Sequence, residues 1–258
     1  MRSKEVHFLK QHRIPKESLL NQLLADKVPE KLQSTLDAAF EKAFSLIFEN
    51  GTGVIDKTFQ KGKMQDTYQM NEFADSLKQN RKTLHSFTRK AKGSGKKNLI
   101  LSGAAGIGMG LAGVGIPDIP VLTGFMLKSI YEIALSYGYD YESEKEQAYI
   151  LMLIQRAVSS GEHLNSIDAQ INQYILDEQL PDNYDRKFQI QETAHSLSKE
   201  LLYMKFVQGI PVVGAMGGIS DIVYMKRITE YARIKYCRRF LIQKKAIFEH
   251  NKKRNSHY

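Results

Sequence analysis

Hydrophobic residues recur along most of this chain at the 3.6-residue spacing of amphipathic helices. The clearest case is 29–50, where Leu32, Leu36, Phe40, Ala43, Phe44, Ile47 and Phe48 share one helical face. Similar patterns predict helices over 15–25, 68–87, 120–137, 143–158, 167–175 and 184–205, and from 221 into the tail. Alternation of polar and apolar residues between turn signals, which is typical of strands, does not occur. We therefore expect an all-α fold, a multi-helix bundle.

Local sequence signals predict where one of these helices ends and where the next begins. Gly138 stands where a glycine commonly ends a helix, after the pattern over 120–137. Ser143 and Glu146 have the S-x-x-E spacing of a capping box, which predicts a helix start. The stretch 148–154 is apolar on nearly all sides, so we expect this helix in the middle of the core.

A glycine-rich stretch at 98–117 carries no charged residue. Glycine is unfavourable inside a helix by about 0.8–1 kcal/mol relative to alanine, so a helix here requires close packing to offset the cost. Small residues four apart form two ladders, which permit two backbones to approach closely in a bilayer or in a dry core. We expect the packing glycines to be Gly103, Gly106, Gly108, Gly110 and Gly113.

A second uncharged run at 206–220 repeats this arrangement, with Gly214, Gly217 and Gly218 as its packing glycines. Each run contains Gly-Ile-Pro and leads into a long helix, so we predict two glycine-rich helical hairpins, at 98–124 and 206–220, related as a weak internal repeat. The two aspartates at matching points are expected to be helix caps. The predicted turn residues are Gly115, Pro117, Asp118, Pro120, Gly209, Pro211 and Asp221.

The 258 residues are 42% hydrophobic, enough for a buried core without disulfides. We expect an N-terminal helical extension at 1–28, one helical domain at 29–248 with a basic hinge at 88–97, and a basic disordered tail at 249–258. The single cysteine, Cys237, excludes an internal disulfide and is expected to be a packing residue. The polar N-terminus has no apolar signal core, which favours a cytoplasmic protein.

The formal charge of +9 is concentrated in two blocks. Eight basic residues and no acid lie between 76 and 117, and eleven basic residues face two acids between 226 and 254. Such blocks suit an anionic partner, either lipid headgroups or nucleic acid, although solvated helix faces would look the same. The candidate residues for an anionic surface are Arg89, Lys90, Lys92, Lys96, Lys97, Arg227, Arg233, Lys235, Arg238, Arg239, Lys244 and Lys245.

Three motifs resemble sites but lack their context. Glycines at 108, 110 and 113 match G-x-G-x-x-G without the preceding strand, and 93–97 lacks the first glycine and the Mg²⁺-binding hydroxyl of a phosphate loop. Glu192 and His195 have di-iron spacing, but no second pair accompanies them. We therefore expect no nucleotide, no metal and no other cofactor.

Two separated motifs in a fixed order connect the chain to a known family. Residues 113–140 read GVGIPDIPVLTGFMLKSIYEIALSYGYD, a helix with an acidic start follows at 142–155, and 209–241 read GIPVVGAMGGISDIVYMKRITEYARIKYCRRFL. In these motifs the chain resembles the EcsC protein family over about 29–241. That family is bacterial and largely uncharacterised, and it is named for the third member of an operon whose other members look like an ABC transporter. The resemblance implies a non-catalytic accessory role near a membrane and supplies no catalytic residues.

The leading hypothesis is a cytoplasmic protein that lies peripherally on the inner face of the cell membrane. Its basic blocks would bind the anionic surface, and its glycine-rich hairpins would insert shallowly or dock on a membrane transporter. The alternative is a soluble helical protein whose basic surface binds nucleic acid or an acidic protein. An enzyme would require a convergent polar cluster, for which Asp118, Glu132 and Glu192 are the first candidates.

Overall fold

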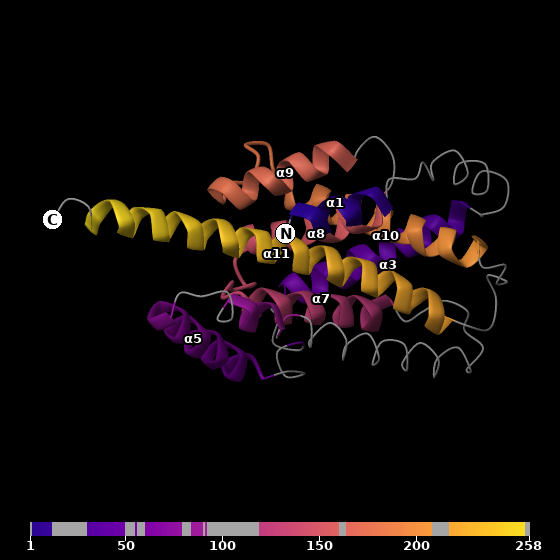
Figure 1. Cartoon of the computed structure of the whole chain (residues 1–258). Coiled ribbons are helices and arrows are strands. Elements are labelled where there is room, and N and C mark those ends of the chain that lie inside the picture. The colour runs from indigo at the N-terminus through magenta and orange to yellow at the C-terminus, as the bar shows by residue number, and fades with distance from the viewer. Residues whose placement is uncertain are drawn as a thin grey trace.

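Every element in the described part of the chain is an α-helix (Figure 1). The computed structural model describes residues 2–11, 30–49, 55, 60–78, 84–89, 91, 119–159, 164–207 and 217–255. Within them no strand occurs, which confirms the all-α prediction. The elements are α1 (Arg2–Gln11), α3 (Glu30–Glu49), α5 (Lys61–Lys78), α7 (Ile119–Ser136), α8 (Glu144–Val158), α9 (Leu164–Asp177), α10 (Arg186–Val207) and α11 (Gly217–Asn255).

Two apolar helices, α7 and α8, form the centre of the bundle. Helix α8 packs against α9, α10 and α11, and residues 148–154 are all buried, as their uniform hydrophobicity predicts. Helix α7 packs against α3, α5 and α11. It is long and apolar enough to cross a membrane, but 67% of it is buried inside the protein, which is equally typical of a core helix.

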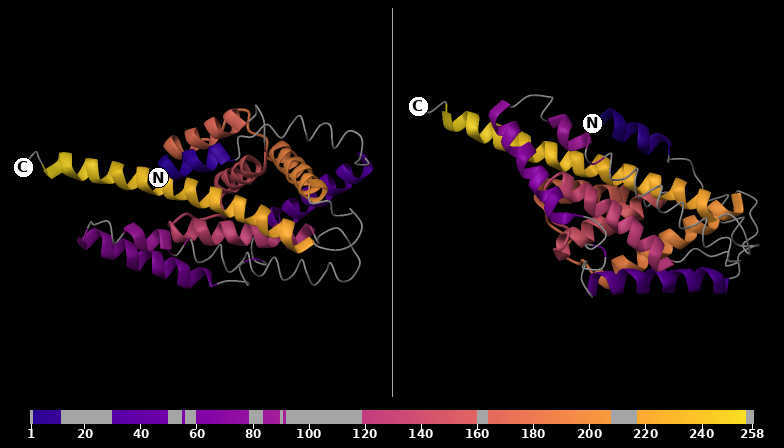
Figure 2. Two further views of the ribbon diagram at one scale, coloured as in Figure 1. Left: turned by 45° about the vertical axis from the view of Figure 1, so that its right-hand side comes forward. Right: turned by 90° about the horizontal axis from the view of Figure 1, so that it is seen from below.

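Helix α11 runs along the whole body and its C-terminal end projects beyond the other helices (Figures 1 and 2). It has 39 residues and contacts α1, α7, α8, α9 and α10. Residues on most of its sides are buried between Met225 and Phe240, whereas those from Lys245 to Lys252 are exposed. The helix continues to Asn255, so the tail predicted to be disordered from 249 is helical over most of its length.

The first half of the chain agrees less well with its hydrophobic pattern. Helix α3 confirms the prediction over 29–50. The pattern over 68–87 is instead divided between α5, which begins at Lys61, and a short helical segment at 84–89. The first turn of α5 is polar, and Met64 and Tyr68 pack only partly into the core, so its periodicity is weak.

Several of the predicted features lie outside the described residues. This applies to the helix at 15–25, most of the hinge at 88–97, and the repeat of two hairpins. Pro120 lies in the first turn of α7, where a proline is tolerated. Gly217 and Gly218 begin α11, and Asp221 is its fifth residue, inside the helix and not at the predicted turn or cap. The following also lie outside: Gly103, Gly106, Gly108, Gly110, Gly113, Gly115, Pro117, Asp118, Gly209, Pro211 and Gly214.

The predicted ends of α7 and α8 are confirmed, with one difference. Gly138 has φ +84°, and the amides of Gly138 and Tyr139 donate to the carbonyls of Leu135 and Ala134, the arrangement of a Schellman motif. Ser143 Oγ accepts a hydrogen bond from the Glu146 amide, 3.2 Å away. The Glu146 carboxylate does not complete the capping box, because it points into the core and bonds to α11.

We predict that Gly138→Ala destabilises the protein by more than about 2 kcal/mol. The left-handed backbone alone costs an L-residue about 1–2 kcal/mol. In addition, a Cβ at this position would lie 2.3 Å from Cζ of the Tyr68 ring on α5. Urea denaturation measures the loss.

Gly124→Ala is the matched control, because Gly124 lies inside α7, the helix that Gly138 follows, and a Cβ there would have no described heavy atom within 4 Å. There the substitution is expected to be neutral or to stabilise by up to about 1 kcal/mol. Equal effects at both glycines would contradict the assignment of Gly138 as a constrained helix end.

Candidate functional site

The basic residues of α11 are paired with acids that come from different neighbouring helices. Going along α11, Arg227 pairs with Glu200 of α10, Lys235 with Glu5 of α1 and Asp168 of α9, Arg239 with Glu146 of α8, and Lys244 with Glu72 and Asp75 of α5. One helix thus supplies the positive charge and the surrounding helices supply the negative charge. These four of the eleven basic residues in the C-terminal block are therefore engaged within the fold.

The most enclosed of these pairs joins Arg239 to Glu146. Arg239 Nη1 donates to Glu146 Oε2 over 2.7 Å, and the Tyr236 hydroxyl donates to the other carboxylate oxygen over 2.6 Å. The guanidinium also lies 4.0 Å from the ring centroid of Tyr139 and 5.1 Å from that of Tyr174. Charge pairing and cation–π contacts therefore act on the same side chain.

Burial strongly affects the titration of this cluster. Burial raises the pKa of the Glu146 carboxyl above its ordinary value, although Arg239 and the hydrogen bond from Tyr236 oppose it. Burial lowers the pKa of the Arg239 guanidinium, but the Glu146 carboxylate raises it more, and the net pKa lies above its ordinary value. Burial and the nearby Glu146 raise the pKa of Tyr236, so its hydroxyl remains a donor.

Glu178 closes the outer side of the same cluster from a strained backbone position. It follows α9 directly and has φ +56°, the left-handed region that a non-glycine residue rarely adopts. Its carboxylate accepts hydrogen bonds from Arg239 Nη2 over 2.8 Å and from Gln243 Nε2 over 2.9 Å. The contact with α11 gives a reason for a glutamate at a position that suits glycine.

A second buried network ties the N-terminal helix to α11. Lys235 is fully buried and donates to Glu5 over 2.7 Å and to Asn172 over 3.0 Å. Arg156 donates to Asp168 over 2.8 Å, and Asp168 lies 3.3 Å from Lys235 Nζ. Burial would raise the pKa of Asp168, but Lys235 and Arg156 lower it below its ordinary value. The carboxylate is therefore held in its charged form.

These positions correct part of the predicted anionic surface. Lys235 and Arg239 are buried against carboxylates, so their assignment to a membrane-facing surface is wrong in this structure. A run of lysines and arginines looks the same in sequence whether it meets lipid or buried acids. Four further candidates are partly buried and have carboxylate partners: Arg227, Arg233, Arg238 and Lys244. Two candidates are exposed, Arg89 and Lys245. The others lie outside the described residues: Lys90, Lys92, Lys96 and Lys97.

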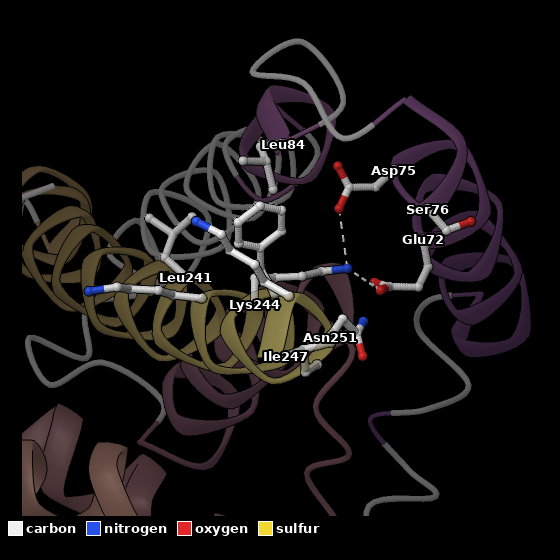
Figure 3. Close-up of a pocket in the computed structure, with 11 residues that line it drawn as sticks. Glu72, Asp75, Ser76, Leu84, Leu241, Lys244, Ile247 and Asn251 are labelled. Atoms are coloured by element: carbon white, nitrogen blue, oxygen red, sulfur yellow. Dashed lines mark hydrogen bonds and ion pairs between the residues drawn. The ribbon is translucent and has the colours of Figure 1, made fainter. Parts of the chain in front are cut away.

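A groove opens where α5 and the 84–89 segment face the projecting end of α11 (Figure 3). Its volume is about 840 Å³. Lys244 reaches from α11 across the groove to Glu72 and Asp75 of α5, and Asp75 Oδ2 lies 3.2 Å from its Nζ. The apolar part of the lining consists of Leu84, Leu241, Ile247 and Phe248. We call this pocket the arm groove; its polar lining consists of Glu72, Asp75, Ser76, Lys244, Lys245, Asn251 and Lys252.

Exposed apolar side chains surround this end of the molecule. Ile247 and Phe248 are 57% and 56% exposed in the final turns of α11, and Met70 and Phe73 of α5 are more exposed still. Large apolar side chains that remain in water commonly mark an interaction surface. The distribution of charge along the sequence did not predict this surface, although the apolar pair between Lys245 and Lys252 was a visible signal.

Among the residues considered for catalysis or metal binding, the described ones, Glu132, Glu192 and His195, do not gather into a site, and Asp118 lies outside the described residues. Glu132 is buried on α7, Glu192 is exposed on α10, and neither lines the arm groove or a second, 390 Å³ pocket between α3 and α10. His195 pairs with Asp37 instead of approaching Glu192 as a ligand pair. Among the described residues, no group of three or more histidines, cysteines or acids could hold a metal ion.

Comparison with known proteins agrees with the resemblance that the motifs carry. The model of the EcsC protein family matches residues 4–241, so the match includes most of the N-terminal segment expected to lie outside it. "Uncharacterized protein YdbA" of Bacillus subtilis (strain 168) is 27% identical over 86% of this chain and 83% of its own length. "Protein EcsC" of the same strain is 26% identical over 87% of this chain and 88% of its own length. No solved structure matches the chain.

We predict that Arg239→Met lowers the free energy of unfolding by about 3–5 kcal/mol, since it leaves Glu146 buried without its cation. Arg233→Met is the control on the same helix, because Arg233 pairs only at 3.8 Å with the half-exposed Glu230. It is expected to cost less than about 1 kcal/mol. Denaturant titration of both variants measures the two losses in the free energy of unfolding. Equal losses would contradict a larger contribution from the buried Arg239–Glu146 pair.

The His195–Asp37 pair, which joins α10 to α3 over 3.0 Å, predicts a pH-dependent contribution to stability. The hydrogen bond to Asp37 raises the pKa of His195 above its ordinary value of 6.5. Burial alone would raise the pKa of Asp37, but the hydrogen bond with His195 lowers the pKa of this carboxyl below its ordinary value of 3.8. The pair therefore stabilises fully between about pH 4 and 6.5, and loses its effect as the pH rises through the folded pKa of His195.

The difference in unfolding free energy between wild type and His195→Gln should consequently be larger at pH 6 than at pH 8.5. It should stay below about 1 kcal/mol, since the imidazole is 53% exposed. Denaturant titrations at both pH values measure the difference. A pH-independent difference would be inconsistent with a charged pair.

Proposed function

Since the chain belongs to the EcsC protein family, we propose that it is a non-catalytic accessory protein bound peripherally to the inner face of the cell membrane. It acts beside a membrane transporter and attaches to anionic lipid. The projecting end of α11 and the adjacent part of α5 form the attachment surface. The glycine-rich segments 98–124 and 206–220 would pack as helical hairpins, and since the second leads into the end of α11 opposite the attachment surface, we propose that they dock on the transporter instead of inserting into lipid.

The observation that supports this best is the exposed apolar pair Ile247 and Phe248 between exposed lysines. Lys245 and Lys252 flank the pair on α11, and Lys245 is 76% exposed. An interfacial helix typically combines apolar side chains that enter the lipid with lysines that reach the headgroups. Each lysine near an anionic surface contributes about 1 kcal/mol, so a few lysines and two apolar side chains together give reversible attachment.

Buried ion pairs narrow the region that could bind lipid. The cations up to Arg239 are mostly occupied by acids, so the middle of α11 contributes little free charge. We therefore propose that attachment uses one end of the molecule instead of the entire basic block. Attachment through one end also leaves the rest of the bundle free to contact a partner.

We predict that the protein sediments with vesicles of phosphatidylglycerol and phosphatidylcholine at low salt, and much less at high salt or with phosphatidylcholine alone. Phe248→Glu should reduce the bound fraction severalfold, since it adds a negative charge to the apolar pair. Phe188→Glu is the matched control, because Phe188 is 62% exposed but lies on α10.

Recovery of the wild-type protein in the supernatant under all conditions would contradict the proposal. Equal losses in both variants would contradict the choice of surface. Salt-sensitive retardation of oligonucleotides without vesicle binding would instead support the nucleic-acid alternative.

A further inference from the structure

The arm groove differs from a flat adhesive surface because it has depth. Its volume of about 840 Å³ lies within the range of small-molecule sites. Two separate parts of the chain form its walls, α5 with the 84–89 segment on one side and α11 on the other (Figure 3). A ligand could therefore be enclosed between helices instead of resting on one of them.

The three lysines that line the groove differ in how strongly they are paired with acids. Lys244 is bound to both Glu72 and Asp75, so its charge is fully engaged and this wall of the groove has two acids for one cation. Lys245 and Lys252 also line the groove, and their side chains are exposed. The partner of Lys245 is Glu249, 3.6 Å away and itself 59% exposed, a pairing that solvent makes weak. A ligand's negative charge would be favoured at these two lysines.

The apolar side chains between these polar groups indicate the rest of the ligand. Leu84 and Leu241 are partly buried in the groove, whereas Ile247 and Phe248 remain more than half exposed. An apolar chain that entered the groove would remove the latter two from water. The combination of an apolar wall and a cationic rim is complementary to an amphiphile with an anionic head.

We propose that the arm groove holds one acyl chain of an anionic membrane lipid, with its headgroup at Lys245 and Lys252. This proposal rests on the proposed function for its choice of a membrane lipid as the source of the amphiphile. It goes further by assigning a stoichiometric lipid site, so that one lipid is partly drawn out of the bilayer when the protein attaches.

The test uses the full chain and a lysophosphatidylglycerol that carries a fluorophore on its acyl chain, below its micellar concentration. The wild-type protein should bind it saturably at one molecule per chain. Ser76→Trp fills the groove from an exposed position of α5 and should weaken binding at least tenfold. Gln69→Trp, on the same helix but not in the groove lining, should leave binding unchanged.

A second pair of variants tests the headgroup. Lys245→Glu combined with Lys252→Glu should weaken binding at least fivefold, whereas Lys226→Glu, exposed at the other end of α11, should not. Inorganic phosphate should fail to displace the probe, because the apolar wall requires the acyl chain. Displacement by phosphate would overturn the assignment.

Other outcomes separate the two proposals. If wild type sediments with anionic vesicles but does not bind the labelled lipid saturably, or if both tryptophan variants bind it alike, the groove assignment is overturned and attachment to the membrane stands. Saturable lipid binding without sedimentation overturns membrane attachment alone. A wild-type dimer that Ser76→Trp disperses, with no lipid binding, would show that a second copy of the chain occupies the groove.

Discussion

Charge buried along α11 is the constraint on which the described structure depends. Lys235 and Arg239 lie in a core where an unpaired cation would cost several kcal/mol, so each has to meet a carboxylate. These carboxylates come from α1, α8 and α9 and the residue that follows it. Each of these cations has to face its own carboxylate, which fixes the rotation of α11 about its axis. The pairs therefore define how the helices are arranged around α11.

Local patterns predicted the helices well where one side of a helix is apolar or where a cap is present. The sequence predicted helix α3, the helix end at Gly138 and the N-cap at Ser143. It could do so because periodicity and caps depend on residues within a few positions of one another. The 68–87 pattern gave a wrong start, since the polar first turn of α5 has little periodicity.

The role of the basic block was harder to predict because it depends on distant residues. Arg239 and Glu146 are 93 positions apart, and Lys235 and Glu5 are 230 apart. No spacing rule connects them, so the sequence could not distinguish cations for lipid from cations for buried acids. Glu146 shows the difficulty well, because its S-x-x-E spacing correctly predicts a helix start but not the direction of its side chain. The groove at the end of α11 was missed for the same reason.

The contact between the first and last described helices has a consequence for how the protein is made. During synthesis Glu5 of α1 leaves the ribosome 230 residues before its partner Lys235. Glu146 likewise has no cation until Arg239 is available. A nascent chain or one truncated before α11 therefore contains acids that cannot be buried, and it cannot complete its core. The core is therefore expected to be completed only after α11 has emerged, and chains that lack α11 would remain open to proteolysis.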